Sequence, residues 1–135
     1  MDKLFTGLYG AFASNATLSG AVTGMYYGTA PSDTNLPYIT YNLISNVPTW
    51  DFGATKPTTY EQSIIQFSIF SDDFNSVSNI CQIYSDLTLL YDDATLTMTG
   101  YNQIMLQRSS SALRQIPNEE VWMYTCDYDV MIQKT

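Results

Sequence analysis

The sequence predicts an α+β fold, in which a mostly antiparallel sheet of about four or five strands carries two main helices on one face. Two internal segments, 36–44 and 60–70, alternate apolar and polar residues with the two-residue period of a strand. A third alternating segment, 121–133, closes the chain. Between them, residues 74–91 repeat apolar side chains at the three- and four-residue steps of a helix. With 135 residues and no linker-like tract, residues 1–135 are expected to form one domain.

The first helix is expected over about residues 2–13. Its apolar stripe consists of Leu4, Phe5, Leu8 and Phe12. The run 11–13 resembles a signal-peptide cleavage site, but Thr6, Gly7 and Gly10 interrupt the apolar run before it, and Asp2 stands where such peptides are basic. We therefore expect no signal peptide and a cytoplasmic protein, with no run long enough to span a membrane. A short second helical turn is expected near residues 16–19, then an extended piece from Met25.

The first internal strand places Ile39, Tyr41 and Leu43 on one face, and the second places Ile65, Phe67 and Ile69 on one face. We expect the two strands to pair antiparallel. Residues 45–58 contain two prolines and a glycine, which predicts a long loop rather than a tight hairpin. Long loops in small domains are often functional.

Helical spacing follows the second strand closely, so Ser71 or Asp72 is expected to cap the next helix by accepting backbone N–H bonds. The apolar stripe of that helix is Phe74, Val77, Cys81, Tyr84, Leu87 or Thr88, and Tyr91, widened by Ile80. Residues 95–107 are expected to form a β segment bent at Gly100. Residues 107–120 are expected to form a second long loop.

The last strand alternates two sets of side chains. The set expected to face the helices is Trp122, Tyr124, Cys126, Tyr128, Val130 and Ile132. Asp127 and Asp129 then lie side by side on the other face. Such a pair can help to bind a hard cation or take part in acid–base chemistry, but both need further oxygen ligands or partners that the sequence does not identify. The alternative is a solvated face or an acidic lumen surface.

Charge argues against capture of a nucleic-acid backbone, because five Lys and Arg stand against thirteen Asp and Glu and the net charge is −8. A path through which DNA slides would tolerate this acidity. Charged residues make up only 13% of the chain, which leaves a surface rich in Ser, Thr, Asn, Gln and Tyr. A weakly charged, Tyr-rich surface often becomes an interface.

The chain contains no histidine, which excludes Ser-His-Asp and Cys-His catalytic sites. It also lacks the glycine-rich nucleotide-binding patterns and the nucleophile-elbow pattern. Cys81 and Cys126 are too few for structural zinc, and we interpret both as reduced core thiols; whether they approach each other closely enough for a disulfide is left open. We expect no enzymatic activity, no metal and no cofactor.

Five further residues are candidate interface positions. Trp50 and Phe52, with Asp51 between them, belong to a loop that either packs onto its own domain or anchors a partner through its aromatic rings. Arg108 and Arg114, in the expected second loop, either pair with acidic groups of a neighbouring subunit or remain solvated loop charges.

Two segments together resemble a known family. Leu36-Pro37-Tyr38-Ile39-Thr40-Tyr41 and Gln66-Phe67-Ser68-Ile69-Phe70-Ser71-Asp72-Asp73 are similar to the "LPYVVY … VQVDVWA" type of pattern of the tail-completion, or tail-terminator, proteins of long-tailed bacteriophages and prophages, also called head-to-tail joining proteins. The order of expected elements follows that family along nearly the whole chain. The Phe- and Asp-rich start of the helix and the Ser-, Thr- and Tyr-rich surface depart from it.

The resemblance implies a virion assembly protein located at the head–tail junction, after assembly in the host cytoplasm. Such a subunit forms a homo-oligomeric ring, a hexamer, which caps the tail tube and joins the head connector. Its partners would be the major tail tube protein and a head-completion or connector protein, with DNA passing through the lumen without specific binding and no membrane involved. The family offers no single functional residue to transfer.

Two other classes remain open from the sequence. One is a non-enzymatic binding module or regulator of phage or bacterial origin that uses the Trp50 loop against one protein partner. The other is a metal-assisted hydrolase that uses Asp127 and Asp129.

Overall fold

The computed structural model describes residues 2–49, 60–72, 77–92, 94–117 and 119–134, which form three helices and five strands. In chain order these are α1 (Asp2–Ala13), α2 (Ala16–Ala21), β1 (Met25–Tyr27), β2 (Tyr38–Thr49), β3 (Tyr60–Ser71), α3 (Ser78–Tyr91), β4 (Tyr101–Ile116) and β5 (Val121–Lys134). The strands form one sheet in the order β1-β2-β3-β5-β4. All neighbours pair antiparallel except β1 and β2, which are parallel.

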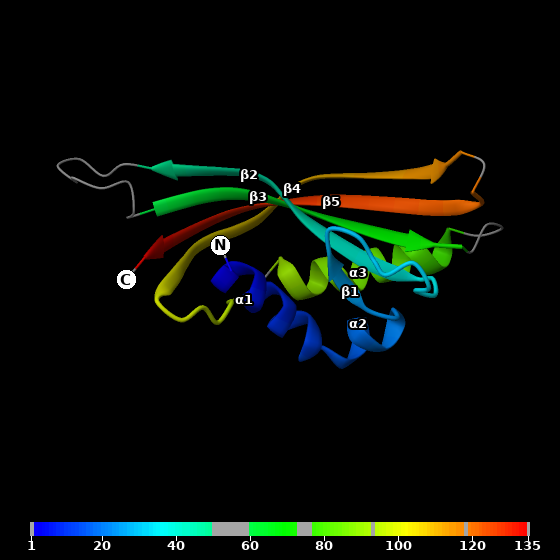
Figure 1. Cartoon of the computed structure of the whole chain (residues 1–135), viewed down its shortest axis with the longest axis horizontal. Helices are drawn as coiled ribbons and strands as arrows, with labels where there is room; N and C mark the ends of the chain where they lie inside the picture. The colour runs from blue at the N-terminus through cyan, green and yellow to red at the C-terminus, as the bar shows by residue number, and fades with distance from the viewer. Residues whose placement is uncertain (1, 50–59, 73–76, 93, 118, 135) are drawn as a thin grey trace.

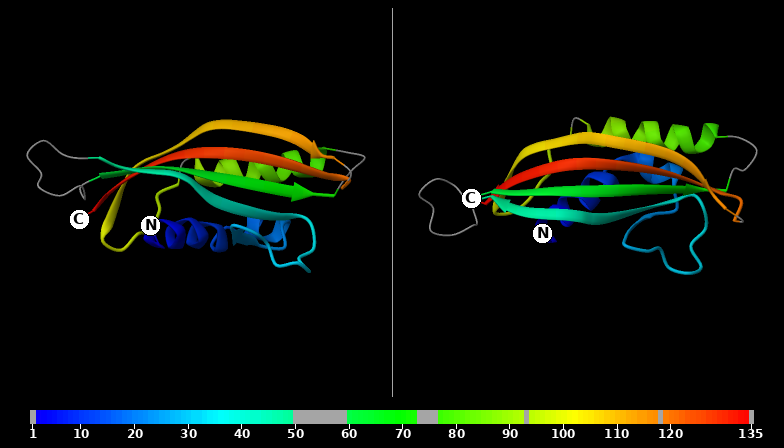
Figure 2. Two further views of the ribbon diagram at one scale, coloured as in Figure 1. Left: turned by 45° about the horizontal axis from the view of Figure 1, so that its top comes forward. Right: turned by 90° about the horizontal axis from the view of Figure 1, so that it is seen from above.

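The helices all lie on one face of this sheet, and the other face is open (Figures 1 and 2). The expected α+β class with a mostly antiparallel sheet is therefore confirmed. The two longer helices, α1 and α3, are the expected pair, and α2 is a short addition whose first turn is capped by the Asn15 side chain. The described residues contain no helix that is both long and apolar enough to cross a membrane.

The core lies between the helices and the sheet and is centred on stacked aromatic rings. Phe67 of β3 stacks on Tyr91 of α3 at a centroid distance of 4.8 Å, and it meets Tyr128 of β5 edge-on at 5.8 Å. The hydroxyl of Tyr91 donates a hydrogen bond of 2.7 Å to the backbone carbonyl of Leu8 in α1. This bond gives a fully buried hydroxyl a partner and ties the two long helices together.

The amphipathic patterns correctly predict which faces are buried. Leu4, Leu8 and Phe12 of α1 are buried. On β5, the predicted set is buried or packed against the core: Trp122, Tyr124, Cys126, Tyr128, Val130 and Ile132. Both cysteines are free thiols, with Cys126 buried and Cys81 half-buried.

The first long loop is shorter than predicted, because β2 continues to Thr49 and β3 begins at Tyr60. The sequence reading ended the strand at residue 44 because a proline follows at 48. The outer side of β2 pairs with β1 only at residues 39–41, and a proline is tolerated in a strand with a free edge. The antiparallel pairing of β2 with β3 is as predicted.

The predicted start of the long helix is wrong. Ser71 is the last residue of β3, and α3 begins at Ser78 after Val77, whose side chain makes no cap hydrogen bond. Phe74 lies outside the described residues. The predicted stripe is largely confirmed, because Ile80, Leu87, Thr88 and Tyr91 are buried. Cys81 and Tyr84 are partly buried against the core, and Ile83 is a buried residue that the prediction left out.

The prediction of a second long loop over residues 107–120 is also wrong, since residues 107–116 belong to β4. Residues 95–100 lie outside any strand, and Gly100, with φ +83°, forms the turn that precedes β4. Residues 107–115 are exposed on both faces, so no apolar alternation marks them as a strand. Residues 107–116 are part of a strand because their backbone pairs with β5.

Candidate assembly surfaces

The open face of the sheet carries a row of polar side chains at one level. In register across four strands, this row consists of Asn42, Gln66, Asp127 and Ser110. The Gln66 amide Nε2 donates to Asp127 Oδ1 at 3.0 Å, and the Ser110 hydroxyl donates to Asp127 Oδ2 at 3.2 Å. Both carboxylate oxygens of Asp127 are therefore satisfied by the sheet itself.

Asp129 lies two residues further along the same face, opposite Ile64 on β3 and Gln107 on β4. The predicted side-by-side placement of Asp127 and Asp129 agrees with this register. Within the part of the chain that the structure describes, no group of three or more Cys, Asp or Glu side chains is arranged to hold a metal ion. The arrangement around Asp127 is that of a polar surface held in one conformation by its neighbours.

An open hollow of about 360 Å³ lies beside this row. Its lining residues are Gln66, Ser68, Ala112, Arg114, Met123 and Thr125, from β3, β4 and β5. Ser68, Ala112 and Thr125 contribute small hydroxyl and methyl groups to its lining, and Arg114 lies on the outer strand β4. Among the described residues no carboxylate forms an ion pair with Arg114, so this guanidinium is available to a partner.

Arg108, by contrast, is engaged within its own chain. Its guanidinium donates to the Tyr84 hydroxyl at 2.9 Å and lies 3.3 Å from Asp92 Oδ2. The other oxygen of Asp92 accepts a hydrogen bond of 2.7 Å from Tyr128. This network ties the end of α3 to β4 and β5. Neither earlier interpretation of Arg108, as a loop charge or as a contact to a neighbouring subunit, includes this internal role.

The electrostatics of the network follow from these contacts. The hydrogen bond to Tyr84 raises the pKa of Arg108, with the carboxylate of Asp92 adding to the effect. Burial, and then the hydrogen bond to Asp92, raise the pKa of Tyr128 far above its ordinary value. Burial raises the pKa of the Cys126 thiol to about 11, which makes it a poor nucleophile at neutral pH.

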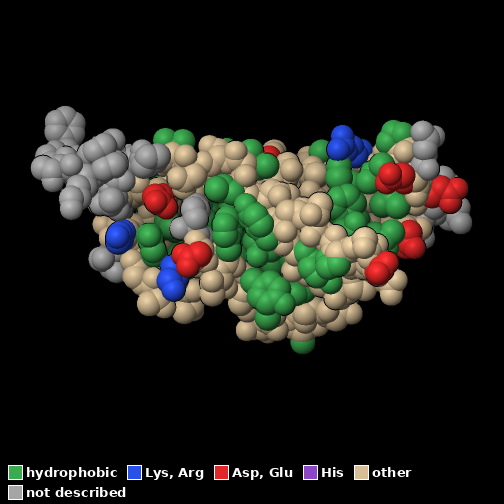
Figure 3. Space-filling model, in the orientation of Figure 1, with side chains coloured by type: hydrophobic (Ala, Val, Ile, Leu, Met, Phe, Trp, Pro, Cys, Tyr) green, Lys and Arg blue, Asp and Glu red, His purple; other side chains and the backbone are tan. Residues whose placement is uncertain are grey.

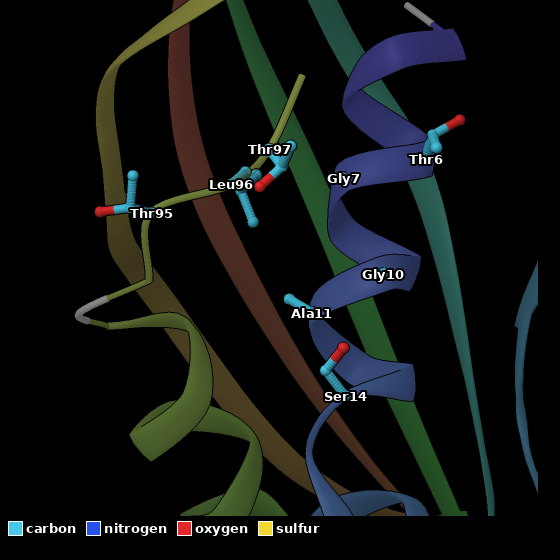
Figure 4. Close-up of a pocket in the computed structure, with 8 residues that line it drawn as sticks. All are labelled: Thr6, Gly7, Gly10, Ala11, Ser14, Thr95, Leu96 and Thr97. Carbon is cyan, nitrogen blue, oxygen red and sulfur yellow. The ribbon is translucent and has the colours of Figure 1, made fainter. Parts of the chain in front are cut away.

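A second hollow, of about 390 Å³, lies between α1 and the extended segment 95–97 (Figure 4). Gly7 allows the close approach here, since a Cβ at that position would lie 3.1 Å from Met98 Cγ and 3.2 Å from the Thr97 carbonyl oxygen. The lining side chains are uncharged and, apart from Leu96, small. No described feature of this hollow selects a ligand.

Trp50, Asp51 and Phe52 lie outside the described residues, so their role as an aromatic anchor stays a prediction. The sequence reading missed the exposed half of β4. One signal was available for it: the last strand is long, and an antiparallel partner of similar length fits immediately before the turn at Pro117.

Charged side chains on the face seen in Figure 3 gather mainly near the two ends of the molecule. Hydrophobic and uncharged side chains cover the middle of that face (Figure 3). A surface of this kind is suited to contact with other proteins rather than with a polyanion.

Comparison with known proteins shows similarity in fold. No protein-family model matches the sequence, and no curated protein matches it. A solved chain from the virion of a native gene transfer agent particle superposes with a TM-score of 0.76 at 11% identity, covering 95% of this chain and 92% of that one. A second solved protein, whose description states no function, superposes with a TM-score of 0.63 at 10% identity, covering 96% and 94%. The chain therefore shares its whole fold with a component of a virion particle.

Proposed function

We propose that this protein is a structural component of a phage-like virion that assembles into a ring, caps the tail tube and joins the tail to the head connector. The observation that carries the proposal is the similarity in fold to a chain of a gene transfer agent virion, which extends over nine-tenths or more of both chains. The sequence resemblance to tail-terminator proteins supports the finer assignment within that class.

The described surfaces agree with assembly rather than turnover. The raised pKa of the Cys126 thiol makes it a poor nucleophile, and the lack of histidine excludes a Ser-His or Cys-His pair. Arg114, which forms no ion pair with a described carboxylate, and the hollow that it lines offer a surface that a protein partner would cover. In this proposal the subunits assemble by burying complementary surfaces, and no chemical reaction takes place.

The net charge of −8 supports a ring through which DNA passes without binding. Asp127 and Asp129 are the open-face carboxylates that would contribute to an acidic lumen. Purified protein is expected to show no retention of double-stranded DNA in a gel-shift assay at 50 mM salt, where electrostatic binding is strong.

Electron microscopy of the protein mixed with assembled tail tubes tests the proposal directly. The expected result is rings of the free protein and a cap at one end of each tube. A protein that stays monomeric at high concentration, and leaves both tube ends bare, would contradict it.

A further inference from the structure

Among the described strands, β2 and β4 each have an edge with little or no pairing. The outer side of β2 is paired by β1 only at residues 39–41, and no described strand continues that pairing along 42–49. On the opposite edge, β4 has β5 as its single described neighbour over its whole length of 16 residues. Free edges of this length are templates for pairing with another chain.

The two edges have compatible directions. Because the β2–β3, β3–β5 and β5–β4 pairs are all antiparallel, β4 runs opposite to β2. In a ring whose axis runs along the strands, each copy is related to the next by rotation about that axis, and such a rotation leaves strand directions unchanged. The β2 strand of the next copy in a ring therefore lies antiparallel to β4, which is the pairing that antiparallel hydrogen bonds require.

The free parts of the two edges also lie at the same height in the molecule. One row of register partners crosses the sheet through Val47, Gln62, Met131 and Met105. Ile104 is the bulge residue next to Met105, so Ile104 on one edge stands level with Val47 on the other. A closed ring has no translation along its axis, so these levels meet at the contact between copies.

Both stretches carry exposed apolar side chains and no charge. Ile44 and Val47 on β2 are each 55% exposed, and Ile104 on β4 is 50% exposed. Residues 42–49 and 101–107 contain no Asp, Glu, Lys or Arg. Proteins commonly protect free edges with charged side chains, and neither stretch has that protection.

We propose that neighbouring copies of this chain join by strand pairing, with residues 101–107 of β4 in one copy lying antiparallel to residues 42–49 of β2 in the next. This inference rests on the proposed ring and names the surface that builds it. The contact is heterologous, so each copy uses both edges and the sheet continues from subunit to subunit.

Cysteine cross-linking tests the contact. One preparation carries Val47→Cys and a second carries Ile104→Cys, both with Cys81→Ser so that the buried Cys126 is the remaining native thiol. Side chains paired across two strands are close enough for a disulfide. On mild oxidation, covalent dimers are expected when the preparations are mixed and not when either is oxidised alone.

Charge substitutions give a second readout. Val47→Lys and Ile104→Glu are each expected to raise the concentration for half-assembly at least tenfold in analytical ultracentrifugation. The two changes together are expected to restore assembly, and Val47→Lys with Ile104→Lys is not. The matched control is Leu89→Lys, since Leu89 is an apolar side chain 74% exposed that belongs to α3 and lines a hollow with Asn15 and Thr17 rather than standing on a strand edge. Circular dichroism checks that each variant is folded.

The outcomes separate the two proposals. If the unmodified protein forms rings, but the mixed preparations give no dimers and the charge variants assemble normally, the strand contact is wrong and the ring stands. Dimers from either preparation alone would indicate a symmetric contact and also overturn it. An unmodified protein that forms no ring contradicts the proposed function itself.

Discussion

The two faces of the sheet are built from the same strands but differ in what holds them. On the covered face, Phe67 stacks on Tyr91 of α3, both rings meet Tyr128 edge-on, and all three are fully buried. On the open face, Gln66, Asp127 and Ser110 are joined by hydrogen bonds. The covered face fixes the fold through apolar burial, whereas the open face is kept ordered without a helix above it and stays available to a partner.

The sharpest test of this difference compares two phenylalanines of β3. Phe67 is fully buried on the covered face, and Phe70 lies half-buried on the open face against Tyr38 at a centroid distance of 5.1 Å. Phe67→Ala is expected to lower the free energy of unfolding by about 3–5 kcal/mol, because it leaves a cavity in the core. Phe70→Ala is expected to cost about 1 kcal/mol. Urea unfolding of both variants measures the ratio, and equal losses would contradict the account.

Alkaline pH tests the covered face by titration. Burial raises the pKa of Tyr91 and Tyr128 well above 10, so in that range the unfolded chain loses these protons while the folded chain keeps them. Their contribution to stability is full below pH 10 and is lost as pH rises above it, at about 1.4 kcal/mol per pH unit for each group. Burial raises the pKa of Cys126 to about 11, which adds a loss between pH 9 and 11.

The comparison for this titration is Tyr128→Phe, which removes one of the titrating hydroxyls. The slope of stability against pH above pH 10 is expected to decrease, although the variant loses the hydrogen bond to Asp92 at neutral pH. Thermal unfolding followed from pH 8 to 11.5 gives both slopes. Identical slopes for the two proteins would show that Tyr128 does not titrate in this way.

On the open face, Asp127→Asn tests the polar row. With the amide oxygen kept toward Gln66, the new NH₂ faces Ser110, whose hydroxyl must turn from donor to acceptor, so two charge-assisted hydrogen bonds are replaced by neutral ones. The expected loss of stability is about 1 kcal/mol. Ser110→Ala, which removes a single donor at an exposed position, is the milder control. A loss as large as that of Phe67→Ala would mean that the open face supports the fold as strongly as the core.

The smallest expected difference in stability is between substitutions of the two arginines of β4. Arg108 pairs with Asp92 at side-chain exposures of 39% and 36%, so Arg108→Gln is expected to cost at most about 1 kcal/mol. Arg114→Gln is expected to leave stability unchanged, because no described carboxylate pairs with it. Chemical denaturation of the two variants side by side measures this difference. A larger loss for Arg114→Gln would show that its guanidinium supports the fold of the free subunit.

The sequence predicted best where one face of an element is buried. The patterns at Leu4, Leu8 and Phe12, and along β5, identified both the elements and their inner faces, because burial imposes a period on the side chains. The α+β class and the pairing of β2 with β3 followed from the same patterns.

Prediction failed where burial imposes no pattern. Residues 107–115 of β4 form a strand although both of their faces are exposed, so a polar, serine-rich stretch was read as a loop. The long helix begins without a side-chain cap at Val77, so the capping residues near Ser71 gave the wrong start. Among the candidate site residues, the pairing of Arg108 with Asp92 depends on β4 lying beside α3, which no local pattern encodes.

In the function proposed above, this chain works as an assembled ring. Native mass spectrometry of the purified protein at increasing concentration, alone and with tail tube protein, tests it most directly. A closed oligomer of six copies that persists when tube protein is added is expected. A monomer at the highest concentration, with tube protein present, would contradict it.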